Sequence, residues 1–89
     1  MGLFSKQKIK AGETLSIYYN PRRVFLMLIN DTESTIFISE DPTRIKELGI
    51  PLYPFEIIVF DKGDGDKAEG PFYVYSDQEV EIRIYEGVV

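Results

Sequence analysis

The chain contains no cysteine, no histidine and no tryptophan. Without cysteine it has neither a disulfide nor a thiolate metal ligand. Without histidine it lacks the commonest metal ligand and the side chain that usually acts as a general base near neutral pH. These absences argue against zinc and non-haem iron chemistry, and the sequence predicts no cofactor and no bound transition metal.

Basic charge and long apolar runs are also scarce. The 10 Lys and Arg residues are outnumbered by 15 Asp and Glu, for a net charge of −5. Such an acidic chain suits a polyanion poorly, so nucleic acid is not expected as a partner. No apolar run reaches the roughly 18–20 residues that span a bilayer, and Met1–Phe4 is far shorter than the apolar part of a signal peptide. No membrane partner is expected either.

The charge is unevenly distributed along the chain. Residues 1–23 hold five basic residues and one acidic residue, whereas residues 24–89 hold five basic and fourteen acidic residues. A basic start on an acidic body favours contact between copies of the chain. The alternative is that Lys6, Lys8 and Lys10 solvate one face of a strand.

The length of 89 residues fits one domain, residues 1–89. Apolar residues alternate with polar ones in short segments separated by turn residues, which is typical of antiparallel strands. One helical turn is expected at 45–48, capped by Asp41 or Thr43 and ended by Gly49. The fold class predicted is all-β, an antiparallel, jelly-roll-like β-sandwich. About seven strands are expected, at Leu3–Ile9, Glu13–Tyr19, Arg22–Asn30, Ser34–Glu40, Phe55–Phe60, Phe72–Tyr75 and Glu79–Tyr85.

One strand is apolar on both faces. Residues 24–29 are all hydrophobic, so if Val24, Leu26 and Leu28 face the core, the alternate side chains face outward. We predict that this surplus forms the interface of a homo-oligomer, a trimer or a dimer, since soluble monomers rarely expose such a patch. The alternative is that residues 41–54 cover the face within one chain. The predicted interface residues are Phe25, Met27, Ile29, Phe37, Ile58 and Phe60.

Other candidate sites have simpler explanations. The acidic, glycine-rich segment Asp61–Asp66 has carboxylates suited to calcium, but its spacing differs from an EF-hand loop, and an ordinary solvated loop is the simpler interpretation. A hydrolase would need two converging carboxylates or an activated nucleophile, and the sequence shows neither arrangement. We therefore expect no catalytic residues and no enzymatic activity.

The tyrosines are candidates for sugar binding, because sugars stack on flat aromatic rings. They are Tyr18, Tyr19, Tyr53, Tyr73, Tyr75 and Tyr85.

About three quarters of the chain resembles a family of small phage and prophage virion-associated proteins. The segments that carry the resemblance are NPRRVFLMLIND (20–31), TIFIS (35–39), GIPLYPFE (49–56), GPFYVYS (70–76) and VEIRIYE (80–86). The family often has Pro-Gly-Glu where this chain has Pro54-Phe55-Glu56, which puts the tight turn expected there in doubt. The resemblance implies an all-β accessory component of a capsid, neck or tail, and it brings no catalytic residues.

The leading functional hypothesis is therefore a structural virion accessory protein that acts by self-assembly and by contact with capsid or tail proteins. It would be located in the virion, or in the host cytoplasm before assembly. The alternative is a stand-alone binding module for a glycan or a host protein. The many Glu, Lys, Ile and Tyr residues are compatible with a thermophilic host.

Overall fold

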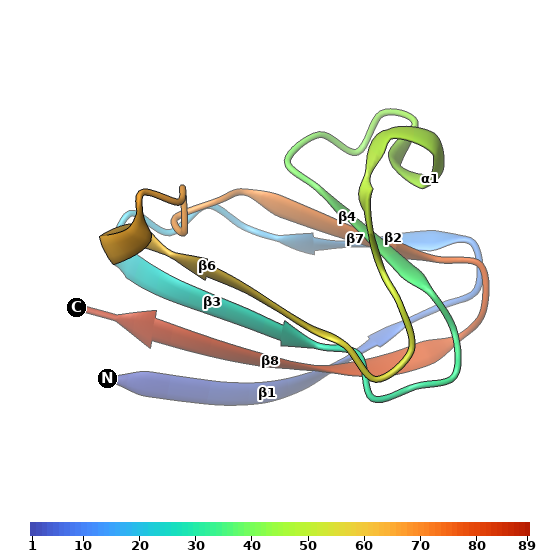
Figure 1. The fold of residues 1–89 in the computed structure, drawn as a ribbon, viewed down its shortest axis with the longest axis horizontal. Helices are drawn as coiled ribbons and strands as arrows, with labels where there is room; N and C mark the ends of the chain where they lie inside the picture. The colour runs from blue at the N-terminus through green and yellow to red at the C-terminus, as the bar shows by residue number, and fades with distance from the viewer.

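The computed structural model describes all residues from Met1 to Val89 and contains two antiparallel sheets packed face to face (Figure 1). The first sheet has the strand order β1-β8-β3-β6 and the second has the order β2-β7-β4-β5. The elements are β1 (Gly2–Ile9), β2 (Glu13–Ile17), β3 (Arg23–Ile29), β4 (Ile36–Ser39), α1 (Ile45–Leu48), β5 (Ile50–Leu52), β6 (Ile57–Asp61), the 3₁₀ turn η1 (Lys62–Asp64), β7 (Phe72–Ser76) and β8 (Val80–Val88).

This strand order is that of an eight-stranded jelly roll, in which successive strands alternate between the sheets except at β4 and β5, which are neighbours in the second sheet. It confirms the predicted all-β sandwich, with eight strands where about seven were expected. The additional strand is β5, which pairs with β4 through Ile36 and Leu52. With three residues and a central proline, β5 is too short to show an alternating pattern.

The core lies between the two sheets and is almost entirely aliphatic. Alternation on β8 buries Val80, Ile82 and Ile84, as predicted, while Glu81 and Arg83 are exposed. Twelve buried residues form one cluster, to which both sheets contribute: Ile9, Ile17, Leu26, Leu28, Ile36, Ile38, Leu52, Phe72, Val74, Val80, Ile82 and Ile84. Burial of this apolar surface is the main force that holds the sheets together.

The helical turn α1 has the predicted bounds but not the predicted cap. Arg44, in the left-handed region at φ 53°, occupies the N-cap position without a capping side chain. Asp41, three residues before the N-cap, instead accepts a hydrogen bond from the backbone N–H of Thr43. No helix in the structure is long and apolar enough to span a membrane.

An ion pair tethers α1 to the turn after β7. Lys46 Nζ lies 2.8 Å from a carboxylate oxygen of Asp77, and the Tyr75 hydroxyl donates to the other oxygen at 2.7 Å. The hydrogen bonds from Lys46 and then Tyr75 hold the pKa of Asp77 below its usual value. The same contact with Asp77 raises the pKa of Lys46. The cluster is solvent-exposed and connects two surface segments.

The turn between β5 and β6 forms although no glycine is present in it. The backbone N–H of Glu56 donates to the carbonyl of Tyr53 at 3.2 Å, closing a four-residue turn around Pro54 and Phe55. Phe55 has a φ of 64°. Proline at the second position with positive φ at the third defines a type II turn, whose third position normally holds glycine. Phe55 therefore occupies a strained backbone conformation at this turn.

We expect Phe55→Gly to stabilise the protein by about 0.5–1 kcal/mol, because glycine adopts positive φ without the steric penalty of a Cβ atom. Phe55→Ala is the matched control, since it removes the exposed ring but keeps the Cβ atom and hence the strain. Thermal unfolding of the three chains would measure the effect. Equal melting temperatures for the glycine and alanine variants would show that the strain contributes nothing.

Candidate functional site

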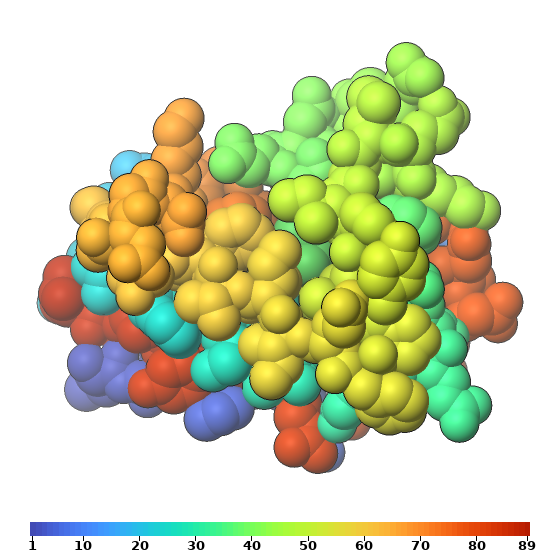
Figure 2. Space-filling view, viewed as in Figure 1, coloured from blue at the N-terminus to red at the C-terminus, as the bar shows by residue number.

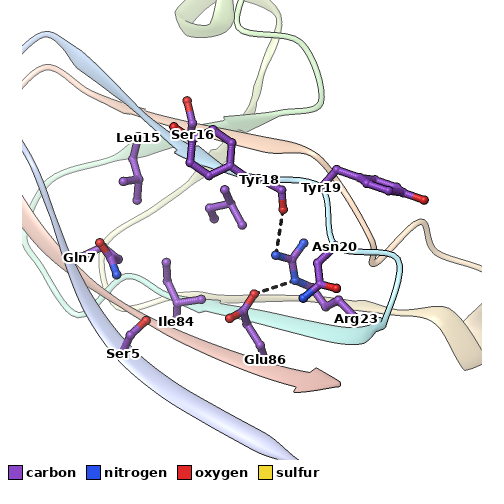
Figure 3. Close-up of a pocket in the computed structure, with 11 residues that line it drawn as sticks. Ser5, Gln7, Leu15, Ser16, Tyr18, Tyr19, Asn20, Arg23, Ile84 and Glu86 are labelled. Carbon is purple, nitrogen blue, oxygen red and sulfur yellow. Dashed lines mark hydrogen bonds and ion pairs between the residues drawn. The ribbon is translucent and has the colours of Figure 1, made fainter. Parts of the chain in front are cut away.

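A polar cleft lies where the two sheets separate, between the β1–β8 side and β2 (Figure 3). Its volume is about 480 Å³. Ser5 and Gln7 on β1 and Glu86 on β8 have the same strand register as the buried residues Ile82 and Ile84, so they point into the sandwich. Polar side chains thus occupy positions that the core fills with aliphatic residues elsewhere.

Arg23 spans the inner end of this cleft and connects the sheets. Its side chain is 4% exposed. Its Nε donates to Glu86 at 2.7 Å, and one terminal nitrogen donates to the Tyr18 carbonyl at 3.0 Å. The other terminal nitrogen contacts the carbonyls of Ala68 and Glu69. The guanidinium of a first-sheet residue therefore holds both the end of β2 and the segment before β7.

A β-bulge directs Arg23 into the interior. Arg23 pairs with Val88 and Phe25 with Gly87, so two steps along β3 match one step along β8. In a regular strand Arg23 would lie on the same outer face as Phe25. The bulge turns its side chain inward. Arg23 was not singled out from the sequence, because nothing in the local pattern marks the bulge.

The chemistry available in the cleft is limited to hydrogen bonding. Arg23 and Glu86 are its only charged lining residues, and they form an ion pair with each other. Among the lining residues there is one carboxylate, whereas glycoside hydrolysis uses two. Ser5 and Gln7 offer a hydroxyl and an amide beside the apolar walls formed by Leu15 and Ile84. This arrangement suits a neutral polar ligand better than a charged one.

The acidic loop uses its carboxylates to order its own backbone. Asp61 accepts a hydrogen bond from the N–H of Gly63 at 2.8 Å, and Asp66 accepts one from the N–H of Asp61 at 2.9 Å. No group of three acidic, histidine or cysteine side chains in the structure is placed to hold a metal ion. The structure therefore does not bring Asp61, Asp64 and Asp66 together as a calcium site.

The outer face of the β1-β8-β3-β6 sheet is a further candidate surface. The strand register aligns Phe4, Tyr85, Met27 and Val59 in one row that crosses all four strands. The rings of Phe4 and Tyr85 have centroids 4.7 Å apart. The neighbouring rows add Phe25 on one side and Ile29 and Ile57 on the other. We call these seven residues the outer apolar face; Phe4, Ile57 and Val59 are its most exposed members.

The structure divides the six predicted interface residues among three locations. Phe25, Met27 and Ile29 lie on the outer apolar face, as expected. Ile58 and Phe60 were wrongly assigned to it: their register partners are Leu28 and Leu26, and they pack on the core from the inner side. Phe37 lies on the outer side of the other sheet, where its ring faces Tyr75 at 6.5 Å. Whether the outer apolar face is an interface remains a prediction.

The error in β6 arose because apolar and polar residues do not alternate along it. All of Ile57, Ile58, Val59 and Phe60 are apolar, so the sequence does not reveal which two point inward. The structure assigns Ile57 and Val59 to the outer side. In the space-filling view, β6 and the turn before it form a continuous surface beside β3 (Figure 2). Residues 41–54 extend towards the edge of the second sheet, where β5 pairs with β4.

The six tyrosines do not form one platform. Tyr73 and Tyr75 lie on the outer side of the second sheet, and Tyr85 lies on the outer apolar face. Tyr53 is in the turn before β6. Tyr18 and Tyr19 are beside the cleft, and the Tyr19 ring points away from it (Figure 3). A single aromatic surface for stacking a sugar is therefore not present.

Comparisons with known proteins identify a fold but no family. No family model matches the chain, and no curated protein matches it in sequence. Among solved structures, the chain is similar to a cupin superfamily protein from Desulfitobacterium hafniense DCB-2, with a TM-score of 0.66 and 11% sequence identity. The match covers 99% of this chain and 68% of that chain. At this identity the likeness concerns the fold alone, and the chain has a cupin-like, all-β sandwich fold.

Proposed function

We propose that this chain is a structural accessory protein of a virion, as part of a head, neck or tail, and that it acts through self-assembly rather than catalysis. The observation that carries the proposal is the outer apolar face, seven side chains that cross an entire sheet with no element of the chain packed over them. Soluble monomers rarely expose a contiguous apolar surface of this kind. The resemblance of the strand segments to small phage virion-associated proteins supports the virion assignment.

Charge favours a second copy of the chain as the occupant of this face. Lys6 and Lys8 lie at its β1 corner, where Lys6 Nζ is 3.9 Å from one carboxylate oxygen of Glu81 and the two lysines leave a net positive charge. Asp61 lies at the diagonally opposite corner on β6. A two-fold axis along the other diagonal would place Asp61 of each copy against the lysine corner of the other. An isologous contact of this kind is the commonest symmetry of homo-oligomers. It would bury the apolar row and pair opposite charges at its ends.

Met27 is central to the outer apolar face, and we expect Met27→Glu to dissociate the oligomer. A carboxylate there would have to be buried without a partner, which costs several kcal/mol per ion. Light scattering at micromolar concentration should give at least twice the chain mass of 10.3 kDa for the parent and half of the parent's mass for the variant, because a two-fold contact joins copies in pairs. Phe37→Glu is the matched control, because Phe37 is equally half-buried on the outer side of the other sheet.

A monomeric parent chain, or a Phe37→Glu variant that dissociates as readily as Met27→Glu, would contradict the assignment of the interface. The virion assignment has a separate test. Particles purified from the host of the encoding element should contain the chain in a fixed copy number relative to the capsid protein. Absence from those particles would contradict the virion assignment, even if the chain forms oligomers.

A binding module for a glycan or host protein is the second candidate, and the polar cleft favours it. Ser5, Gln7 and one oxygen of Glu86 are directed into about 480 Å³ of open space, a volume within the range of roughly 300–1,000 Å³ usual for small-molecule sites. Titration with neutral oligosaccharides, followed by amide chemical shifts, would show whether residues of the cleft respond.

A further inference from the structure

The first sheet has two free edges of very different character. β1 and β6 are its terminal strands, so each has one side without a neighbouring strand. On β6 this free edge comprises Ile57–Phe60, because the backbone N–H and carbonyl of Asp61 are hydrogen-bonded to Asp66. β1 is eight residues long and carries Lys6 and Lys8 without an acidic residue. β6 contains no lysine, arginine or proline, and its exposed side chains are Ile57, at 56%, and Val59, at 42%.

Edge strands normally carry a device that prevents pairing with another chain, such as lysine, proline or extreme shortness. On the second sheet, β5 has three residues including Pro51. On β1 the lysines serve this purpose, because two β1 strands paired antiparallel would bring like charges together. β6 has none of these devices. An unprotected, apolar edge of this kind is suited to pairing with a further strand.

We propose that the free edge of β6 pairs with the free edge of β1 from a second copy, extending the first sheet from one molecule into the next. Strand direction permits it: the sheet is antiparallel throughout, so a β1 strand added beside β6 continues the alternation with both molecules oriented alike. Charge favours the pairing of β6 with β1, because the acidic residues Glu56 and Asp61 flank the apolar part of β6 whereas β1 is basic. The lysines that oppose pairing of β1 with itself favour pairing with β6.

This contact is heterologous, so repetition closes a ring when the rotation between copies allows it. This inference rests on the self-association in the proposed function, and it adds the sheet edge to the outer apolar face as a second contact surface. The two surfaces are independent in kind. The edge contact uses backbone hydrogen bonds in the plane of the sheet, whereas the outer apolar face packs side chains perpendicular to that plane.

Because the chain has no cysteine, engineered cysteines can test the pairing without interference. Ser5→Cys places a thiol on β1, and Ile58→Cys places one on β6, both on the inner side of the sheet and therefore off the outer apolar face. The two variants are mixed and treated with a thiol-specific cross-linker of about 10 Å span, which tolerates a register difference of two residues, roughly 6.6 Å. Phe37→Cys, on the central strand β4, is the control.

The expected result is a cross-linked dimer in the mixture of Ser5→Cys with Ile58→Cys, and at least several-fold less in either variant alone. The double variant should give covalent oligomers larger than a dimer. Lys6→Glu combined with Lys8→Glu should reduce the cross-linked fraction several-fold. Cross-linking of a single variant with itself, at the level of the mixture, would indicate two-fold pairing of like edges and overturn the proposal.

The outcomes also separate this proposal from the proposed function. If no mixture cross-links while the parent chain is an oligomer by light scattering, the edge contact is wrong and self-assembly stands. If no mixture cross-links and the parent is a monomer, both fail. Equal cross-linking with Phe37→Cys would indicate random collision and would also overturn the edge contact.

Discussion

Arg23→Met should destabilise the protein by about 3–5 kcal/mol, the cost of removing one partner from a buried ion pair. The variant leaves the carboxylate of Glu86 without its counter-ion. Water compensates this charge poorly, because the Glu86 side chain is only 24% exposed. It also removes the donors that the carbonyls of Tyr18 and Glu69 use across the sandwich. A chain of this size has a total stability on the order of 4–13 kcal/mol, so much of the variant would be unfolded at 37 °C.

Urea unfolding, monitored by circular dichroism, measures this loss. Arg22→Met is the matched control, since Arg22 is the exposed neighbour and its replacement should change stability by about 0.5 kcal/mol or less. Arg23→Met combined with Glu86→Gln should recover roughly 1 kcal/mol or more, because it removes the uncompensated charge. A loss for Arg23→Met no larger than that for Arg22→Met would show that the guanidinium does not hold the sheets together.

Asn30→Asp should cost about 3 kcal/mol, because Asn30 is a fully buried hub of hydrogen bonds. Its amide nitrogen donates to the carbonyls of Ser34, Leu52 and Tyr53, at 2.8, 3.0 and 3.2 Å. Its side-chain oxygen accepts hydrogen bonds from the backbone and the hydroxyl of Thr32. Aspartate keeps the acceptor but has no N–H, so three carbonyls would lose their donor and would face a buried negative charge.

The same urea experiment applies, with two comparisons. Asn20→Asp is the matched control, because the Asn20 side chain serves as an acceptor for the Arg22 backbone, and aspartate retains that function. It should change stability by about 0.5 kcal/mol or less. Thr32→Val removes one hydroxyl from the Asn30 network and should cost about 1 kcal/mol. If Asn30→Asp were as stable as Asn20→Asp, the hub would have no energetic role.

The fold class could be predicted because each alternating segment has a local reason to be a strand. β8 shows this best: Val80, Ile82 and Ile84 are separated by charged residues, and burial of one face determines its register. The helical turn at Ile45–Leu48 was likewise predictable from its spacing and from Gly49. β6 was predictable as a strand but not in its orientation, since its apolar run offers two equivalent faces.

The candidate sites were also predictable only in part from the sequence. The apolar surplus on β3 correctly indicated an outward face with Phe25, Met27 and Ile29, because a strand with two apolar faces is visible in the sequence itself. The partners of that face, Phe4, Tyr85 and Val59, come from three other strands. They become neighbours only through the sheet order, which depends on long-range pairing and not on local pattern.

The sequence by itself therefore determined the absence of histidine and cysteine chemistry, the strand content and the surplus apolar face. These properties follow from composition and from the two-residue period of a strand. The tertiary structure alone decided that a bulge turns Arg23 inward, that Asn30 binds three carbonyls, two of them distant in sequence, and that Phe55 completes a turn normally made by glycine. The bulge and the Asn30 contacts with Leu52 and Tyr53 depend on pairing between residues remote in sequence. The Phe55 turn is local, but the pairing of β5 with β4 and of β6 with β3 fixes its two ends. Such pairing selects side-chain directions and backbone angles that local preference would not choose.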